Sequence, residues 1–299
     1  MKKLIDCTID GTRSVLLREA GASDGKHTLI SNISSHELLQ YILKNNMSIH
    51  QFACNIADVR RVDIKDIKIS RYHAPLKPEN DELAIVSAFG NTHFEINGHP
   101  TQSKELDWFF KGNGRTVITS GDTIRLPGYA YGGGLEIEFA LVLMAGQNGI
   151  PAAIGYVLAN DFSDVEMRRR HPNLANISKL SSTIMSNQMI IGHDIPLSTN
   201  VRCCVVRDGN AAAFTTEGSL GQNAMKYPTQ YLIDTIFQNS DLRMPPFSVH
   251  YLLLGAAIST NKAGFELQHN DIIRADCIDE VDLFLENRYE DEAVISACC

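Results

Sequence analysis

The segment GLEIEFALVL, residues 134–143, constrains the fold more than any other, because it is apolar yet carries two carboxylates one residue apart. In a β-strand, side chains at i and i+2 share a face, so Glu136 and Glu138 point the same way. Leu135, Ile137 and Phe139 then point to the opposite face. Neighbouring carboxylates repel, and buried ones need a proton or a cation. The segment therefore predicts either a strand beside a divalent metal ion or a strand with one solvent-facing side.

A second apolar strand supplies a third carboxylate. The segment GYVLANDFSD, residues 155–164, reads as a strand that ends near Asp161 and turns into a helix. Three carboxylates with no nearby His or Cys suit a hard ion such as Mg²⁺, Mn²⁺ or Ca²⁺ rather than zinc. We expect Asp164 to be the N-cap of a helix that reaches about residue 171.

The remaining pattern predicts an α+β fold. Short apolar runs separated by Gly, Asn, Asp and Pro indicate a β-rich region from about residue 83 onward. Strands are expected at 3–9 and 15–17, and helices at 34–43, 48–57 and 227–239; the first of these helices opens with the capping-box pattern of Ser34 and Glu37. The polar, proline-bearing stretch 66–82 reads as a linker. We therefore expect a small N-terminal α+β domain at 1–78 and a larger domain at 79–299.

Composition limits the partners. The formal net charge of -8 argues against a nucleic-acid binder or an anionic-membrane binder, because such partners are normally met by a basic surface. We also see neither a good signal peptide nor an apolar run of about 18 residues. The seven cysteines show no CxxC spacing and fit reduced thiols. A small-molecule partner and a cytoplasmic location are expected.

The order of several motifs carries a family resemblance. FFKGNG, SGDTIRLP, GLEIEFALVL, GYVLANDFSD, NISKL, LLLGAA and HNDIIRADCID follow one another as in the fumarylacetoacetate hydrolase superfamily. The resemblance runs from about residue 83 to the end. The stretches GNTHFE, NDFSDVEMRRR and NLANISKL look most like the branch of 2-keto-3-deoxy sugar-acid dehydratases, related to arabinonate catabolism.

The resemblance implies a metal site and a lysine beside it. It makes Glu136, Glu138 and Asp161 ligands of Mg²⁺ or Mn²⁺, with Lys179 adjacent and catalytic. A 2-oxo acid can chelate such a metal, which then stabilises the enolate formed when a C3 proton leaves. Lys179 would add positive charge or shuttle a proton. The alternative for Lys179 is a solvated surface charge.

The resemblance also extends to residues around this site. Lys111 falls at the family's lysine position before the metal strand, although a strand-end lysine can instead lie along the surface. His93 and Glu95 lie where the family places a lid or acid–base element; a lone His is more often structural.

Among the three consecutive arginines after Asp164, we assign Arg168 to the substrate carboxylate, although such a run is usually a solvated face.

The chain departs from the family pattern at three places. The usual Gly-Thr after the late strand is Gly255-Ala256, which removes a hydroxyl expected to reach the substrate; both residues remain candidate substrate contacts. The last hairpin has His269-Asn270 in place of the usual Gly, and Asn tolerates a left-handed turn. Val165 replaces an arginine of many hydrolases, which disfavours fumarylacetoacetate as substrate.

The resulting hypothesis is an enzyme. We expect a divalent-metal-dependent lyase that dehydrates a 2-keto-3-deoxy sugar acid through a metal-bound enolate. One alternative is a C–C bond hydrolase, decarboxylase or tautomerase on another 2-oxo acid, because one fold supports several reactions. Another is a non-catalytic metabolite-binding relative, for which Ala256 is the main argument. The resemblance implies the superfamily's mixed-strand β-roll for the larger domain, and a homodimer.

Overall fold

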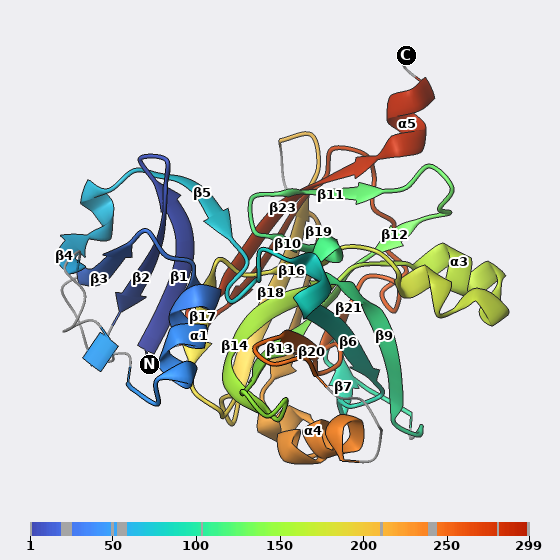
Figure 1. Ribbon diagram of the computed structural model, residues 1–299. Coiled ribbons are helices and arrows are strands. Elements are labelled where there is room, and N and C mark those ends of the chain that lie inside the picture. The colour runs from blue at the N-terminus through green and yellow to red at the C-terminus, as the bar shows by residue number, and fades with distance from the viewer. Residues whose placement is uncertain are drawn as a thin grey trace.

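The computed structural model describes residues 2–18, 26–48, 51–52, 59–102, 104–209, 212–238, 244–279 and 281–297. Within these ranges the chain forms two large mixed sheets with a few short helices around them (Figure 1). The expected α+β class with a β-rich larger part is confirmed. Most of the helix expected at 48–57 lies outside the described residues.

The larger sheet has 14 strands, which come from both sides of the predicted domain boundary. Its N-terminal strands are β1 (Lys2–Ile9), β2 (Thr12–Arg18), β3 (Lys26–Ser31), β4 (Val59–Asp63) and β5 (Ile69–His73). Its other strands are β6 (Ala84–Gly90), β9 (Asp107–Asn113), β10 (Val117–Thr119), β13 (Glu136–Ala145), β14 (Pro151–Asp161), β16 (Thr183–Met185), β17 (Gln188–Ile191), β20 (Val249–Leu253) and β21 (Ile258–Ser259).

The second sheet has five strands in the order β11-β23-β22-β18-β19. These are β11 (Thr123–Leu126), β18 (Thr199–Val206), β19 (Ala212–Leu220), β22 (Ile272–Cys277) and β23 (Phe284–Asp291). Two small pairs complete the described strands, β12 (Gly133–Gly134) with β15 (Ser163–Asp164) and β7 (Glu95–Ile96) with β8 (His99–Pro100).

The described α-helices are short. They are α1 (Ser35–Lys44), α3 (Val165–Arg170), α4 (Thr229–Phe237) and α5 (Glu292–Ala297). The predicted capping box is present in α1, where Ser34 Oγ accepts from the Glu37 backbone and Glu37 accepts from the Ser34 backbone. None of the helices in the described ranges has both the length and the apolar character needed to cross a lipid bilayer.

The N-terminal strands join the rest of the chain through one strand pair. Strand β1 pairs with β17, and β17 pairs with β14, so the sheet runs without a break into the centre of the molecule. Part of the expected linker is a strand, because β5 pairs with β1 from Asp6↔His73 to Ile9↔Ile69. The division at residues 78 and 79 stays a prediction.

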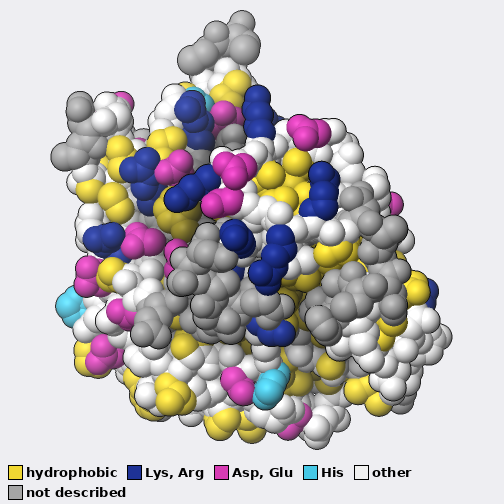
Figure 2. Space-filling view, turned by 90° about the vertical axis from the view of Figure 1, so that its left-hand side faces the viewer, with side chains coloured by type: hydrophobic (Ala, Val, Ile, Leu, Met, Phe, Trp, Pro, Cys, Tyr) yellow, Lys and Arg dark blue, Asp and Glu magenta, His cyan; other side chains and the backbone are white. Residues whose placement is uncertain are grey.

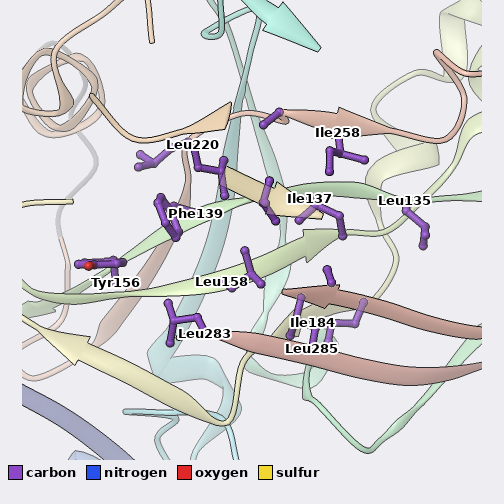
Figure 3. Packing of buried hydrophobic residues seen from close by; sticks show 14 of the residues in the cluster. Leu135, Ile137, Phe139, Tyr156, Leu158, Ile184, Leu220, Ile258, Leu283 and Leu285 are labelled. Carbon is purple, nitrogen blue, oxygen red and sulfur yellow. The ribbon is translucent and has the colours of Figure 1, made fainter. Parts of the chain in front are cut away.

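Strand β13 lies at the centre of the larger sheet, between β14 and β20. Leu135, Ile137 and Phe139 are buried and pack in one cluster with Leu285 of β23 in the second sheet and with Leu283 just before that strand (Figure 3). Alternate residues face away from this cluster, in agreement with the predicted alternation. The two glutamates of β13 lie on that other side.

Candidate metal and substrate site

The backbone register places the carboxylates of Glu136 and Asp161 near each other. Strands β13 and β14 are antiparallel, with Ile137 opposite Asn160, so Glu136 at the start of β13 lies near Asp161 at the end of β14. The Asn160 side chain fixes this junction, because its Oδ1 accepts from the Glu136 backbone N–H at 3.1 Å. Asp161 is only 2% exposed. A buried carboxylate of this kind requires positive charge or hydrogen-bond donors.

Lys179 links these two carboxylates. It ends the 3₁₀ turn η5 (Ile177–Lys179), and its Nζ contacts the Glu136 carboxylate and lies 2.7 Å from Asp161 Oδ2. The ammonium also lies 5.0 Å from the centre of the Phe109 ring. The lysine is 4% exposed, so this contact is largely shielded from water.

Lys111 contacts Asp161 and the Lys179 turn of the same site. Its Nζ lies 2.6 Å from Asp161 Oδ1 and donates to Phe162 O at 2.7 Å and to Lys179 O at 3.1 Å. The side chain has no exposure to solvent. Because an ammonium has three protons and these acceptors use them, Lys111 holds Asp161 and the Lys179 turn in place.

Glu138 is the most enclosed of the three carboxylates. It is 1% exposed, and its Oε2 accepts from the Gly255 backbone N–H at 2.5 Å. Gly255 has φ +96, and a Cβ there would lie 2.0 Å from Thr92 Oγ1. This turn therefore requires glycine, and the glycine in turn provides the donor for Glu138.

The charges of the site are strongly coupled. Burial and the nearby Asp161 and Glu136 hold the pKa of Glu138 well above its ordinary value. Burial opposes ionisation of Asp161, but Lys111 and Lys179 outweigh it and the pKa of Asp161 is lowered. Burial lowers the pKa of Lys111. For Lys179, burial is outweighed by Asp161 and Glu136, and its pKa is raised.

The donor chemistry fits a hard divalent cation. Three carboxylates lie near two ammonium groups, so the formal negative charge exceeds the positive charge, and burial together with this excess raises the pKa of Glu138. The Lys179 ammonium lies between Glu136 and Asp161 and balances their charge, as a bound metal cation would. In the described part of the chain no group of three His, Cys, Asp or Glu side chains already has a metal-binding arrangement. In this structure the Lys179 ammonium occupies one oxygen of Glu136 and one oxygen of Asp161.

His93 lies close to the Glu138 side of the site. Thr92 Oγ1 donates to Leu254 O at 2.6 Å, and its contact with His93 Nδ1 is 2.9 Å. The Thr92 hydroxyl has one proton, which it donates to the Leu254 carbonyl. His93 Nδ1 must therefore be protonated and donate to Thr92 Oγ1. Its Nε2 is then a bare acceptor, and it is buried without a hydrogen-bond partner. Burial and Lys226 lower the pKa of His93 to about 4.

The other predicted site residues lie further out. Glu95 is exposed in the short strand β7 and, within the described ranges, makes no hydrogen bond or ion pair with the carboxylates. Ala256 is half-buried beside Gly255. Arg168 is exposed on α3, and within the described ranges it has no ion pair, whereas Arg169 and Arg170 both pair with Glu166.

Asp164 is the N-cap of α3, as expected. Its Oδ1 accepts from the Met167 backbone N–H at 3.0 Å and from Gly132 N at 3.1 Å, and its Oδ2 accepts from Tyr131 N at 3.0 Å. These backbone donors satisfy the carboxylate. Asp164 is therefore occupied by structural hydrogen bonds.

Sequence reasoning missed several supporting residues. Ser163 Oγ donates to Asp161 O at 3.1 Å, Asn160 orients Glu136, and Ser181 Oγ donates to Phe162 O. Asn160 and Ser163 belong to the ND-x-S motif, so their motif positions were available as a signal. Phe109 and Ser181 carry no comparable signal, because their roles depend on which distant segment they meet.

The fold is shared with solved enzymes. No protein-family model matches the sequence, and no curated protein matches it. A structure described as 2-keto-3-deoxy-D-arabinonate dehydratase with magnesium and 2,5-dioxopentanoate is 18% identical and covers 97% of this chain and 99% of its own, with a TM-score of 0.65. The chain therefore shares the fold of this solved dehydratase.

Other solved structures with this fold have different activities. A 2-hydroxyhepta-2,4-diene-1,7-dioate isomerase from Mycobacterium marinum is 16% identical, covers 98% of this chain and 99% of its own, and has a TM-score of 0.64. A fumarylacetoacetate hydrolase from Exiguobacterium antarcticum is 14% identical, covers 97% of this chain and 100% of its own, and has a TM-score of 0.66. The resemblance seen in the motifs is thus confirmed as a shared fold, which by itself allows several reactions.

Proposed function

We propose that this chain is a divalent-metal-dependent enzyme that dehydrates a 2-keto-3-deoxy sugar acid. The observation that carries the proposal is the meeting of Glu136, Glu138 and Asp161 with the buried Lys179 at one end of the β13–β14 pair. The magnesium in the dehydratase of the same fold supports the choice of cofactor and of substrate class.

Glu136, Glu138 and Asp161 would hold Mg²⁺ or Mn²⁺. The ion would supply Lewis-acid stabilisation of negative charge on the keto oxygen of a 2-oxo acid. Lys111, which has no access to solvent, would keep Asp161 and the Lys179 turn in position. This assignment gives Lys111 a positioning role within the active site.

The proposed reaction removes water from C3 and C4 of the substrate. The C3–H bond breaks, its electron pair forms the C3=C4 bond, and the C4–O bond breaks as the hydroxyl leaves with a proton as water. Lys179, held protonated by two carboxylates, would stabilise charge on the substrate or protonate the leaving hydroxyl. The bare Nε2 of His93 would accept a proton, with exposed Glu95 as a further acid–base group.

Substrate carboxylate binding is assigned to Arg168 and the Gly255-Ala256 turn. Arg168 is the arginine of its run that the described carboxylates leave unpaired. A guanidinium can bind a carboxylate through two hydrogen bonds. Ala256 supplies no hydroxyl, so backbone groups of this turn are the available donors.

Two other functions have specific support. The isomerase and hydrolase with the same fold support C–C hydrolysis, decarboxylation or tautomerisation of another 2-oxo acid. Ala256 supports a non-catalytic metabolite-binding relative. The homodimer and the cytoplasmic location stay predictions.

Proton exchange in D₂O with Mg²⁺ tests the proposal. NMR would follow loss of C3 protons from pyruvate and the products formed from 2-keto-3-deoxy pentonates and hexonates. We expect C3 exchange and water loss in the parent protein, both reduced about 100-fold or more in Lys179→Met. The exposed Lys262→Met is the matched control, with rates like the parent. Cleavage products in place of water loss would favour the hydrolase alternative, and no exchange with any substrate would contradict an enzyme of this class.

A further inference from the structure

A cavity lies between the N-terminal strands and strand β10. Its volume is about 250 Å³, and it is lined by β2, β5, the segment 74–81, β10 and Asp122. Strands β5 and β10 lie near each other in Figure 1. The lining includes none of the residues assigned to the carboxylate and lysine site. The cavity is therefore separate in position from that site.

Two cations of the lining are paired with carboxylates. Arg13 makes a bidentate pair with the fully buried Asp6, at 2.5 Å from Nε to Oδ1 and 3.1 Å from Nη2 to Oδ2. Lys77 Nζ lies 3.1 Å from Asp81 Oδ1. Asp122 Oδ2 accepts from the Thr119 backbone N–H at 2.9 Å. The charges of Arg13 and Lys77 are thus balanced, whereas the backbone N–H leaves the negative charge of Asp122 in place.

Arg71 is the lining cation that remains available. It is on β5, opposite Thr8 of β1, and it is exposed. Its side chain has no ion pair or hydrogen bond to any residue in the described ranges. The Arg13 guanidinium adds a free Nη1 edge, because Asp6 uses only Nε and Nη2. Two guanidinium groups thus face one cavity with donors to spare.

The negative charge in the lining does not cancel these donors. Glu79 is exposed, so water screens its charge. Asp81 and Asp122 are engaged as described above. Basic and acidic side chains are mixed on the face of the molecule that carries the N-terminal strands (Figure 2). The cationic donors that the cavity offers a ligand are therefore Arg71 and the free edge of Arg13.

We propose that this cavity binds a small oxyanion, through Arg71 and the free edge of Arg13. Guanidinium groups match the geometry of carboxylates and phosphates. The volume is below the roughly 300–1,000 Å³ of pockets for drug-sized ligands, which indicates a small metabolite. Crevices between structural units are frequent positions for such sites.

Calorimetric titration of the full chain with inorganic phosphate and with malonate, at constant ionic strength, tests this site. Arg71→Gln is the test variant, because Arg71 has no structural partner whose loss would unfold the chain. Arg115→Gln is the matched control, since Arg115 is 74% exposed, lies outside the cavity, and makes only a 3.5 Å ion pair with Glu82.

We expect saturable binding of at least one of the two anions, weakened about tenfold by Arg71→Gln and unchanged by Arg115→Gln. Tighter phosphate binding would assign a phosphoryl ligand, and tighter malonate binding a carboxylate ligand. Absence of binding for both anions in the parent protein would overturn the proposal. Binding that Arg71→Gln leaves unchanged would overturn it as well. Neither result depends on the metal site.

Discussion

A lysine with no exposure to solvent loses its hydrating water and needs hydrogen-bond acceptors from the protein instead. Lys111 does so with Asp161, Phe162 O and Lys179 O. Two of these acceptors belong to segments 51 and 68 residues away, so no local pattern could reveal them. The sequence placed Lys111 near the site only through a motif position. Its positioning role follows from the three-dimensional contacts.

Replacement of Lys111 by Met should strongly destabilise the fold. It would leave the buried Asp161 with Lys179 as its remaining ammonium partner and would remove one of the two donors to each of Phe162 O and Lys179 O, which keep their bonds from Ser181. Breaking a buried pair on one side costs about 3–5 kcal/mol of unfolding free energy. Urea denaturation measures this change. Lys262→Met, at an exposed position, should shift it by less than about 0.5 kcal/mol, and an equally small effect for Lys111→Met would contradict the assigned role.

His250 should make stability depend on pH. It is fully buried, its Nε2 lies 2.5 Å from Ser87 Oγ, and its Nδ1 has no hydrogen-bond partner. Burial lowers its pKa from 6.5 to about 3. Above pH 6.5 both the folded and unfolded states are neutral at this residue. As the pH falls below that value, only the unfolded state takes up the proton, so stability is lost.

Variants separate this contribution from other titrating groups. Between pH 6.5 and 5, His250→Gln should reduce the slope of unfolding free energy against pH, by at most about 1.4 kcal/mol per pH unit. His193→Gln is the control, because His193 is 81% exposed. Equal slopes for the parent and His250→Gln would show that His250 is not held neutral in the fold.

At the scale of elements, the sequence predicted the features that depend on residues close together in the chain. The period of two in residues 135–139 gave the faces of β13, and the capping box gave the start of α1. Strand β5 was missed, because its polar, proline-flanked stretch pairs with β1 more than 60 residues earlier along the chain, as in Thr8↔Arg71. Such pairing depends on tertiary contacts rather than local composition.

The turn at Gly255 connects an element boundary to the site. Gly255→Ala should destabilise the protein by at least about 2 kcal/mol, because φ is +96 and the new Cβ would meet Thr92 Oγ1 at 2.0 Å. Chemical denaturation measures the change. Gly128→Ala is the matched control, with nothing within 4 Å of its Cβ position, and should change stability by less than about 1 kcal/mol. Similar values for both variants would contradict a required glycine.

At the scale of the whole molecule, the continuous sheet decides where the charged site lies. Strands β13 and β14 are central, so Glu138 and Asp161 are buried by the surrounding structure rather than left on an edge. The sequence offered both a metal site and a solvent-facing strand for the two glutamates. The burial of Glu138 argues against the solvent-facing strand, because water does not reach this carboxylate, and the metal site stays a prediction.

Metal binding tests the central claim most directly. Chelator-stripped protein would be titrated with Mg²⁺ and Mn²⁺ by calorimetry, with and without oxalate as a 2-oxo-acid mimic, for the parent, Glu138→Gln and an exposed control, Glu217→Gln. We expect saturable binding that oxalate tightens, that Glu138→Gln weakens about tenfold or more, and that Glu217→Gln leaves unchanged. No metal binding in the parent, or binding that Glu138→Gln does not affect, would contradict the account.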